Sequence, residues 1–251
     1  MSIVIASKFK NGILLASDRQ VTYYGSKVED QANKIKKIED QPLLIGGVGY
    51  LRELQQIFSI SKEWFSDFGI KQLTNDVCIS YINKLTSIFR EKQFIQENQI
   101  VGGLNGRFLI MDPYNINVIS QDLSVMSNFD YFAIGCGSDL VMGHLNVIFS
   151  NKKPEEMSKS QIDKILTECI ELACKDDVAI DNNIDKIAIY KKAQDLVDDD
   201  NYEVINKCEY DILDKQRPKS KSECNNKCDE CIHNIRFIYS KQEKTIKMIS
   251  N

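Results

Sequence analysis

The sequence lacks a long apolar run and a strong excess of basic residues. No uninterrupted apolar stretch approaches the roughly 20 residues that a membrane-spanning helix requires, so we expect no membrane partner. Lys and Arg number 32 against 36 Asp and Glu, which gives a net charge of -4 and no basic field for nucleic acid. The first residues carry no basic leader, and Lys8 and Lys10 soon break their short apolar run. We therefore expect no signal peptide and a cytoplasmic location.

What the sequence does contain is enough apolar material for a substantial core. It has 251 residues, of which 43% are hydrophobic, and this favours one domain with an appendage. Residues 2–191 carry the periodic patterns of folded structure. Residues 192–251 form a polar extension that is rich in Asp, Lys and Asn.

The patterns predict pairs of helices between groups of strands. Strands are expected over residues 2–9, 13–17, 34–38, 43–45, 100–120, 131–134 and 184–190. Helices are expected over residues 51–68, from residue 74 or 75 to 89, over 139–149 and from about 159 to 173. Because the helices come in pairs, the order favours antiparallel sheets covered by helical layers, an α+β class, over a doubly wound parallel sheet.

Local signals fix some of these boundaries. Asn11-Gly12 predicts a type I′ hairpin turn between the first two strands. Thr74 and Asn75 are both good N-caps for the second helix. The segment Ser158-Lys159-Ser160-Gln161 has the form of a capping box ahead of the last helix.

Seven segments, in order along residues 2–191, resemble the proteasome β subunits and their simpler bacterial relatives. They are Ser2-Ile3-Val4-Ile5-Ala6, Gly12 to Asp18-Arg19, Lys34-Ile35-x-x-Ile38, Ile45-Gly46-Gly47, Asn105 to Pro113, Tyr131-x-Ala133-Ile134-Gly135-Cys136-Gly137 and Asp176-Asp177. Each segment alone means little, but together they make the resemblance specific. It implies a four-layer αββα sandwich, the N-terminal-nucleophile (Ntn) hydrolase fold, and assembly of the chain into homo-oligomeric rings.

The resemblance also implies an endopeptidase that acts on peptide bonds of polypeptide substrates without an organic cofactor. After removal of Met1, the Ser2 hydroxyl would be the nucleophile and its own α-amine the base. Lys34 would supply a positive charge that Asp18 holds in place, and the Gly47 backbone N–H would stabilise the oxyanion. Three supporting residues would lie around them: Arg19, Cys136 and Asp177. An ATP-dependent unfoldase is a candidate partner of such a ring.

The chain departs from the family pattern in three places. Ser2 stands where Thr is usual, and Ser lacks the methyl group that restricts χ1. Cys136 stands where Ser is usual, and a thiol is a poorer hydrogen-bond donor. The segment between Asp177 and Ile184 lacks the expected Ser and Gly, and Asp176 competes with Asp177 for its role.

Two other functions fit the same residues. In the first, an amine rather than water resolves the acyl-enzyme on Ser2, which makes the protein a peptide acyl-transferase or ligase. In the second, the chain is a non-catalytic ring or scaffold subunit that keeps only the fold.

The extension contains a separate candidate site. Cys224, Cys228 and Cys231, with Cys208 upstream, supply enough soft ligands for a tetrahedral structural zinc. Their spacing is irregular, so a tail with unrelated cysteines is the alternative. The other four cysteines, at 78, 136, 169 and 174, lie mostly in apolar surroundings.

Overall fold

The computed structural model divides into two compact units, Met1–Tyr190 and Lys191–Asn251. It describes residues 2–23, 26–29, 33–38, 41–68, 72–91, 104–177, 180–191, 202–206, 236–240 and 245–249.

Two antiparallel sheets form the centre of the first unit. The four-stranded sheet has the order β10-β1-β2-β11, with bounds Tyr131–Gly135, Ile3–Phe9, Gly12–Asp18 and Ile184–Tyr190. The five-stranded sheet has the order β5-β6-β7-β8-β9, with bounds Ile35–Ile38, Leu43–Val48, Arg107–Met111, Ile116–Ile119 and Val125–Phe129. A short ribbon of β3 (Val21–Tyr23) and β4 (Ser26–Glu29) branches off after β2.

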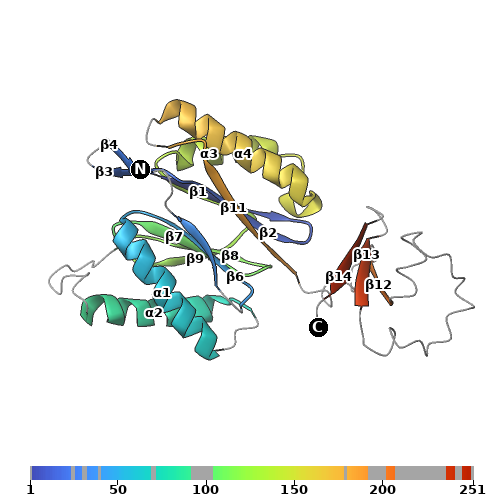
Figure 1. Ribbon diagram of the computed structural model, residues 1–251, viewed down its shortest axis with the longest axis horizontal. Coiled ribbons are helices and arrows are strands. Elements are labelled where there is room, and N and C mark those ends of the chain that lie inside the picture. Colours follow the sequence, from blue (N-terminus) through green and yellow to red (C-terminus); the bar gives the residue numbers. More distant parts are fainter. Residues whose placement is uncertain are drawn as a thin grey trace, which may run out of the picture. The chain divides into compact units, whose positions relative to one another are not determined.

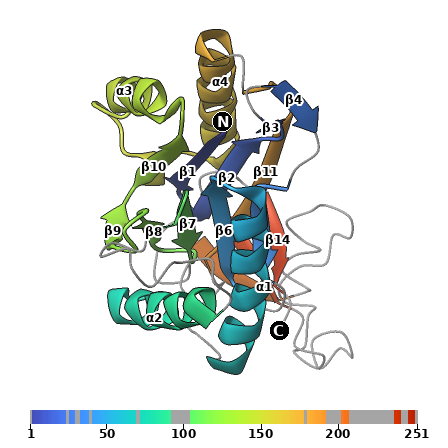
Figure 2. The same cartoon turned by 90° about the vertical axis from the view of Figure 1, so that its left-hand side faces the viewer.

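Two helices cover the outer face of each sheet, as Figures 1 and 2 show. On the five-stranded sheet these are α1 (Leu51–Phe68) and α2 (Asn75–Glu91). On the four-stranded sheet they are α3 (Ser138–Ile148) and α4 (Lys159–Asp176), with a 3₁₀ turn at Pro154–Glu156 between them. The four-layer αββα sandwich is therefore confirmed.

Each boundary between layers has its own apolar core. One cluster, which includes Phe65 and Tyr81, lies between the first helix pair and the five-stranded sheet. A second, which includes Ile5 and Leu166, lies between the four-stranded sheet and the other helix pair. A third fills the space between the two sheets. Strands β1 and β2 serve two clusters because alternate side chains point to opposite faces, so both strands are almost wholly buried.

The first hairpin forms as expected, but its turn is shifted by one residue. Phe9 pairs with Gly12, so Lys10 and Asn11 make the turn and the type I′ prediction for Asn11-Gly12 is wrong. The reason lies in the next strand: Gly12 also pairs with Tyr190 of β11, and a Cβ at Gly12 would lie 2.0 Å from the Ile189 carbonyl oxygen. Gly12 is needed for this close approach rather than for the turn.

The extension contains three strands that the sequence patterns did not predict. These are β12 (Tyr202–Asn206), β13 (Arg236–Ser240) and β14 (Thr245–Ile249), which form an antiparallel sheet of their own. In the described part of the chain, no helix is both long and apolar enough to cross a membrane.

The predicted capping box at the start of α4 is present. Ser158 Oγ accepts a hydrogen bond from the Gln161 N–H at 3.3 Å, and Gln161 Oε1 accepts one from the Ser158 N–H at 2.9 Å. Both bonds satisfy donors that the first helical turn leaves without partners.

We predict that Ser158→Ala lowers the free energy of unfolding by about 1 kcal/mol, because one of these two bonds is lost. Chemical denaturation of the purified protein measures this. Ser160→Ala is the matched control, since Ser160 lies inside the helix and has no cap role. An equal loss in both variants would show that the capping box contributes nothing.

Candidate active site

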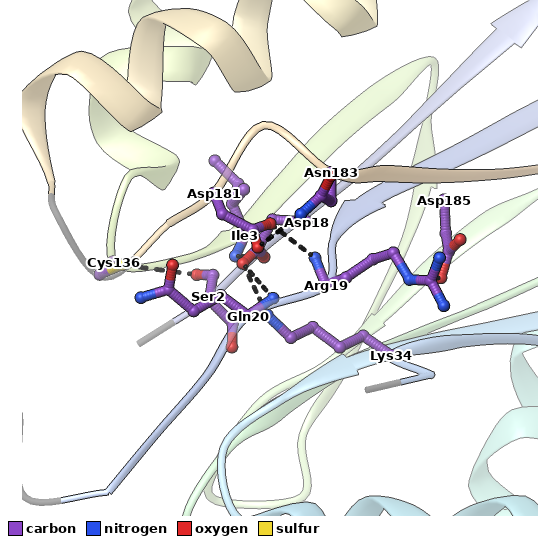
Figure 3. Close-up of polar contacts among 10 residues, drawn as sticks. All are labelled: Ser2, Ile3, Asp18, Arg19, Gln20, Lys34, Cys136, Asp181, Asn183 and Asp185. Atoms are coloured by element: carbon purple, nitrogen blue, oxygen red, sulfur yellow. Dashed lines mark hydrogen bonds and ion pairs between the residues drawn. The ribbon is translucent and has the colours of Figure 1, made fainter. Parts of the chain in front are cut away.

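The peptide unit that joins Ser2 to Ile3 is held at both of its polar ends. Its carbonyl oxygen accepts a hydrogen bond from the Cys136 backbone N–H at 3.1 Å, and the Cys136 thiol lies 3.5 Å from the same oxygen. Its N–H donates to Asp18 Oδ1 at 2.8 Å. Ser2 therefore enters β1 in an orientation that β2 and the end of β10 fix together (Figure 3).

The same Asp18 carboxylate forms an ion pair with Lys34. Lys34 Nζ lies 2.8 Å from Asp18 Oδ2, which also accepts the Gln20 backbone N–H at 3.2 Å. The two side chains are 4% and 0% exposed. Asp18 ends β2 of one sheet and Lys34 directly precedes β5 of the other, so the pair connects the two sheets at the point where Ser2 begins β1.

Burial shifts both members of this pair toward their neutral forms. Loss of hydration raises the pKa of Asp18 above its usual value, although the Lys34 charge and the Ile3 N–H oppose this. Loss of hydration likewise lowers the pKa of Lys34, against the opposing charges of Asp18 and Asp181. A lysine with a lowered pKa gives up its proton more readily than a surface lysine does.

Arg19, next to Asp18 in sequence, is anchored by the loop ahead of β11 and by Asp185 within that strand. The Arg19 N–H donates to Asp181 Oδ1 at 3.2 Å, and its Nε lies 3.4 Å from Asp185 Oδ2. Asn183 Nδ2 donates to the other Asp181 oxygen at 3.3 Å. The Asp181 carboxylate thus both positions the chain next to Asp18 and adds negative charge near Lys34.

Cys136, which contacts the Ser2 carbonyl oxygen, also interacts with Asp177. The Cys136 pKa is raised to about 11 by desolvation of the sulfur, then by a hydrogen bond to Asp177 and the charge of that carboxylate. Of the two candidate acids, Asp177 therefore contacts the thiol; it is also the C-cap of α4. A thiol with a raised pKa stays protonated near neutral pH, which suits Cys136 to hydrogen-bond donation.

The structure gives the Gly47 amide a different partner from the one expected. Its N–H donates to the Lys34 carbonyl oxygen at 2.9 Å, as part of the contact between β6 and the residue before β5. Because this N–H is already paired with a backbone carbonyl, the structure does not support the expected oxyanion role for Gly47. The absence of a side chain matters for packing instead, because a Cβ at Gly47 would lie 2.5 Å from Leu54 Cδ1.

Several contributors were missed in the sequence: Gln20, Asp181, Asn183 and Asp185. For Asp181, Asn183 and Asp185 the available signal was the density of acidic and amide residues around the start of β11; Gln20 carried none. The four cysteines proposed as zinc ligands, Cys208, Cys224, Cys228 and Cys231, lie outside the described residues. Among the residues that are described, no three His, Cys, Asp or Glu side chains form a group that could hold a metal ion.

The family model for the proteasome subunit matches residues 2–189, which includes every strand and helix described above up to β11. The chain belongs to the proteasome subunit family. Among its relatives is a proteasome subunit beta of Nanoarchaeum equitans, 30% identical over 158 residues, which cover 60% of this chain and 75% of that one. Another is the proteasome subunit beta 1 of Hyperthermus butylicus, 23% identical over 191 residues, which cover 73% and 86%.

Solved structures share the fold of this proteasome-family chain at lower identity. Eukaryotic HslV from Trypanosoma brucei superimposes with a TM-score of 0.59 at 16% identity, and the match covers 75% of this chain and 99% of that one. Thiobacillus denitrificans BPH in complex with epoxomicin gives a TM-score of 0.57 at 16% identity, with 75% and 98% covered. These neighbours are Ntn hydrolase folds, which agrees with the four layers seen here.

We predict that Asp18→Asn lowers the free energy of unfolding by about 3–5 kcal/mol, because it leaves the Lys34 ammonium buried without its counter-charge. The control is Asp163→Asn. Asp163 pairs with Lys186 at 3.0 Å, but its side chain is 42% exposed, and loss of that pair should cost less than about 1 kcal/mol. Urea denaturation compares the two, and similar losses would contradict the structural role given to Asp18.

A second prediction concerns Gly135, which has φ +118 and sits against the start of β1. A Cβ at this position would lie 1.9 Å from the Ser2 carbonyl oxygen, so Gly135→Ala must displace Ser2 or strain the backbone. We expect a loss of more than about 1 kcal/mol in thermal or chemical unfolding.

Gly143→Ala is the matched control, because Gly143 lies in α3 with open space around the site of a Cβ. That change should be neutral or stabilising by up to about 1 kcal/mol. Equal stability of the Gly135→Ala variant and the wild type would contradict the close approach.

Proposed function

We propose that this proteasome-family chain is an amide-bond hydrolase that uses Ser2 as an N-terminal nucleophile after Met1 is removed. The observation that carries this is the double role of Asp18, which holds the Ser2–Ile3 peptide with one oxygen and the Lys34 ammonium with the other. The first residue of the processed chain and a buried cation are thereby kept in one fixed cluster (Figure 3).

The α-amine of Ser2 supplies the base. Its ordinary pKa of about 7.7–8.0 leaves part of it unprotonated at neutral pH, so it can take the proton as Ser2 Oγ attacks the scissile carbonyl carbon. The Lys34 charge lowers the cost of forming the alkoxide and of the negative charge that develops on the substrate. The amine then returns the proton to the leaving amine, and water attacks the acyl-enzyme to release a free acid.

The departures from the family pattern bear on rate more than on mechanism. Ser2 keeps the reactive hydroxyl, and Cys136 and Asp18 fix its backbone, but no methyl group restricts its χ1. The Cys136 backbone N–H donates to the Ser2 carbonyl oxygen at 3.1 Å, and the thiol sulfur lies 3.5 Å from the same oxygen. We propose that the active form is a homo-oligomeric ring acting on unfolded polypeptide, as expected of this family.

We predict that Ser2→Ala lowers peptide turnover by about 10³-fold or more, because it removes the attacking oxygen. Ser2→Thr should retain turnover, and Ser66→Ala, at an exposed position of α1, should leave it unchanged. The intact mass of each purified protein is recorded first, since the amine can act only when Met1 is absent.

Labelling identifies the nucleophile directly. An electrophile that reacts with N-terminal hydroxyl nucleophiles is incubated with the protein, and the modified residue is mapped by peptide mass spectrometry. Epoxomicin, which the BPH neighbour holds in complex, is a suitable first probe. Retention of Met1, or equal turnover by Ser2→Ala and wild type, would refute the mechanism; a new amide instead of a free acid as product would assign acyl transfer.

A further inference from the structure

The segment from Asp177 to Ile184 joins the end of α4 to the start of β11, and here the chain departs from the family pattern. The structure describes residue 177 and residues 180–184 of this segment. Both of its ends are fixed, because Asp177 is the C-cap of α4 and Ile184 pairs with Asp18 of β2. The segment therefore leads from a helical layer to the residue that binds Lys34.

The beginning of the segment packs against the residues that follow β10. The Ile180 N–H donates to the Asp177 carbonyl oxygen at 3.1 Å, which ties Ile180 to the end of α4. The Ile180 side chain is buried, and a Cβ at Gly137 would lie 3.1 Å from its Cδ1. Asp177 itself interacts with Cys136, whose backbone N–H binds the Ser2 carbonyl oxygen.

The end of the segment is held to β2 by the half-buried Asp181 carboxylate (Figure 3). Asp181 Oδ1 accepts the Arg19 backbone N–H at 3.2 Å, and Oδ2 accepts a hydrogen bond from Asn183 Nδ2 at 3.3 Å. Arg19 directly follows Asp18, which binds the N–H of the Ser2–Ile3 peptide at 2.8 Å. Asp181 thus binds the chain one residue away from the group that holds this peptide.

We propose that Asp181 is a positioning residue for the active site. Its hydrogen bond to Arg19 holds the segment against β2. The segment then supports both groups that bind the Ser2–Ile3 peptide, which are Asp18 at the N–H and Cys136 at the carbonyl oxygen. A hydrogen bond to an ionised carboxylate is roughly twice as strong as a neutral one, which suits Asp181 to this task. The inference rests on the proposed function, since it concerns the position of the same nucleophile.

Hydrogen exchange with single-amide resolution tests this without any turnover. The Gln20 N–H donates to Asp18 Oδ2 at 3.2 Å and therefore reports on the position of that carboxylate. The Cys136 N–H donates to the Ser2 carbonyl oxygen and reports on the other contact of the peptide. We expect both amides to exchange about tenfold faster in Asp181→Ala, the size associated with one charge-assisted hydrogen bond.

Asp181→Asn is the conservative variant. Its amide oxygen still accepts the Arg19 N–H, and Asn183 can turn its own oxygen toward the new amide group, so both exchange rates should stay close to those of the wild type. On the protein that keeps Ser2, kcat/KM for a peptide substrate should fall about tenfold in Asp181→Ala and stay close to wild type in Asp181→Asn.

Asp163→Ala is the matched control. The Asp163 carboxylate also connects α4 to β11, through Lys186 at 3.0 Å, but it lies outside this segment, so both exchange rates should be unchanged. Equal exchange in Asp181→Ala and wild type, or equal acceleration in Asp163→Ala, would overturn the inference. Faster exchange of both amides in Asp181→Ala, in a protein whose wild type shows no turnover, would refute the hydrolase and still support the role of Asp181 in holding the peptide.

Discussion

The buried ion pair between Asp18 and Lys34 is the constraint on which the site depends. An ion pair of this kind is expensive to bury, because both charges lose their hydration, and apolar residues would fill the same space at lower cost. The pair does more than hold two charges together, because Asp18 also accepts the Ile3 N–H with its other oxygen. The pair therefore fixes the Ser2–Ile3 peptide unit relative to a buried cation.

The layered fold is what makes this arrangement possible. Asp18 and Lys34 come from different sheets, and a packed apolar cluster between the sheets sets their separation. The helical layer that contains α4 also contacts the site. Asp177, the C-cap of α4, interacts with Cys136, which follows β10. The Ser2–Ile3 peptide thus receives contacts from Asp18 at the end of β2 and from Cys136 after β10, and the end of α4 contacts Cys136 in turn.

Most of the secondary structure could be predicted because it depends on local periodicity. The bounds of α1 follow from its apolar spacing and those of α4 from its capping box, and the structure confirms both. The turn after β1 was placed wrongly because Gly12 is required by its pairing with Tyr190 of β11, a strand far away in the sequence. The strands β3, β4 and β9 were missed because their sequences are short and lack clear alternation.

The candidate site, too, contains some residues that could be predicted from the sequence and some contacts that could not. Asp18, Lys34 and Cys136 could be predicted because the family pattern places them, whereas the contacts of Asp181 with Arg19 and near Lys34 depend on how one loop folds back over β2. The hydrogen-bond partner of the Gly47 N–H could not be predicted from the sequence either, because the register between neighbouring strands decides which carbonyl a backbone amide meets.

The position of β5 at the edge of its sheet affects how readily the protein could aggregate. β5 is an edge strand in its sheet, and both of its central residues are exposed lysines. Charged side chains on an edge strand oppose the addition of a further strand from another molecule, because each new copy would bring like charges together. Lys36 and Lys37 therefore oppose edge-to-edge pairing of this sheet with a strand of another molecule.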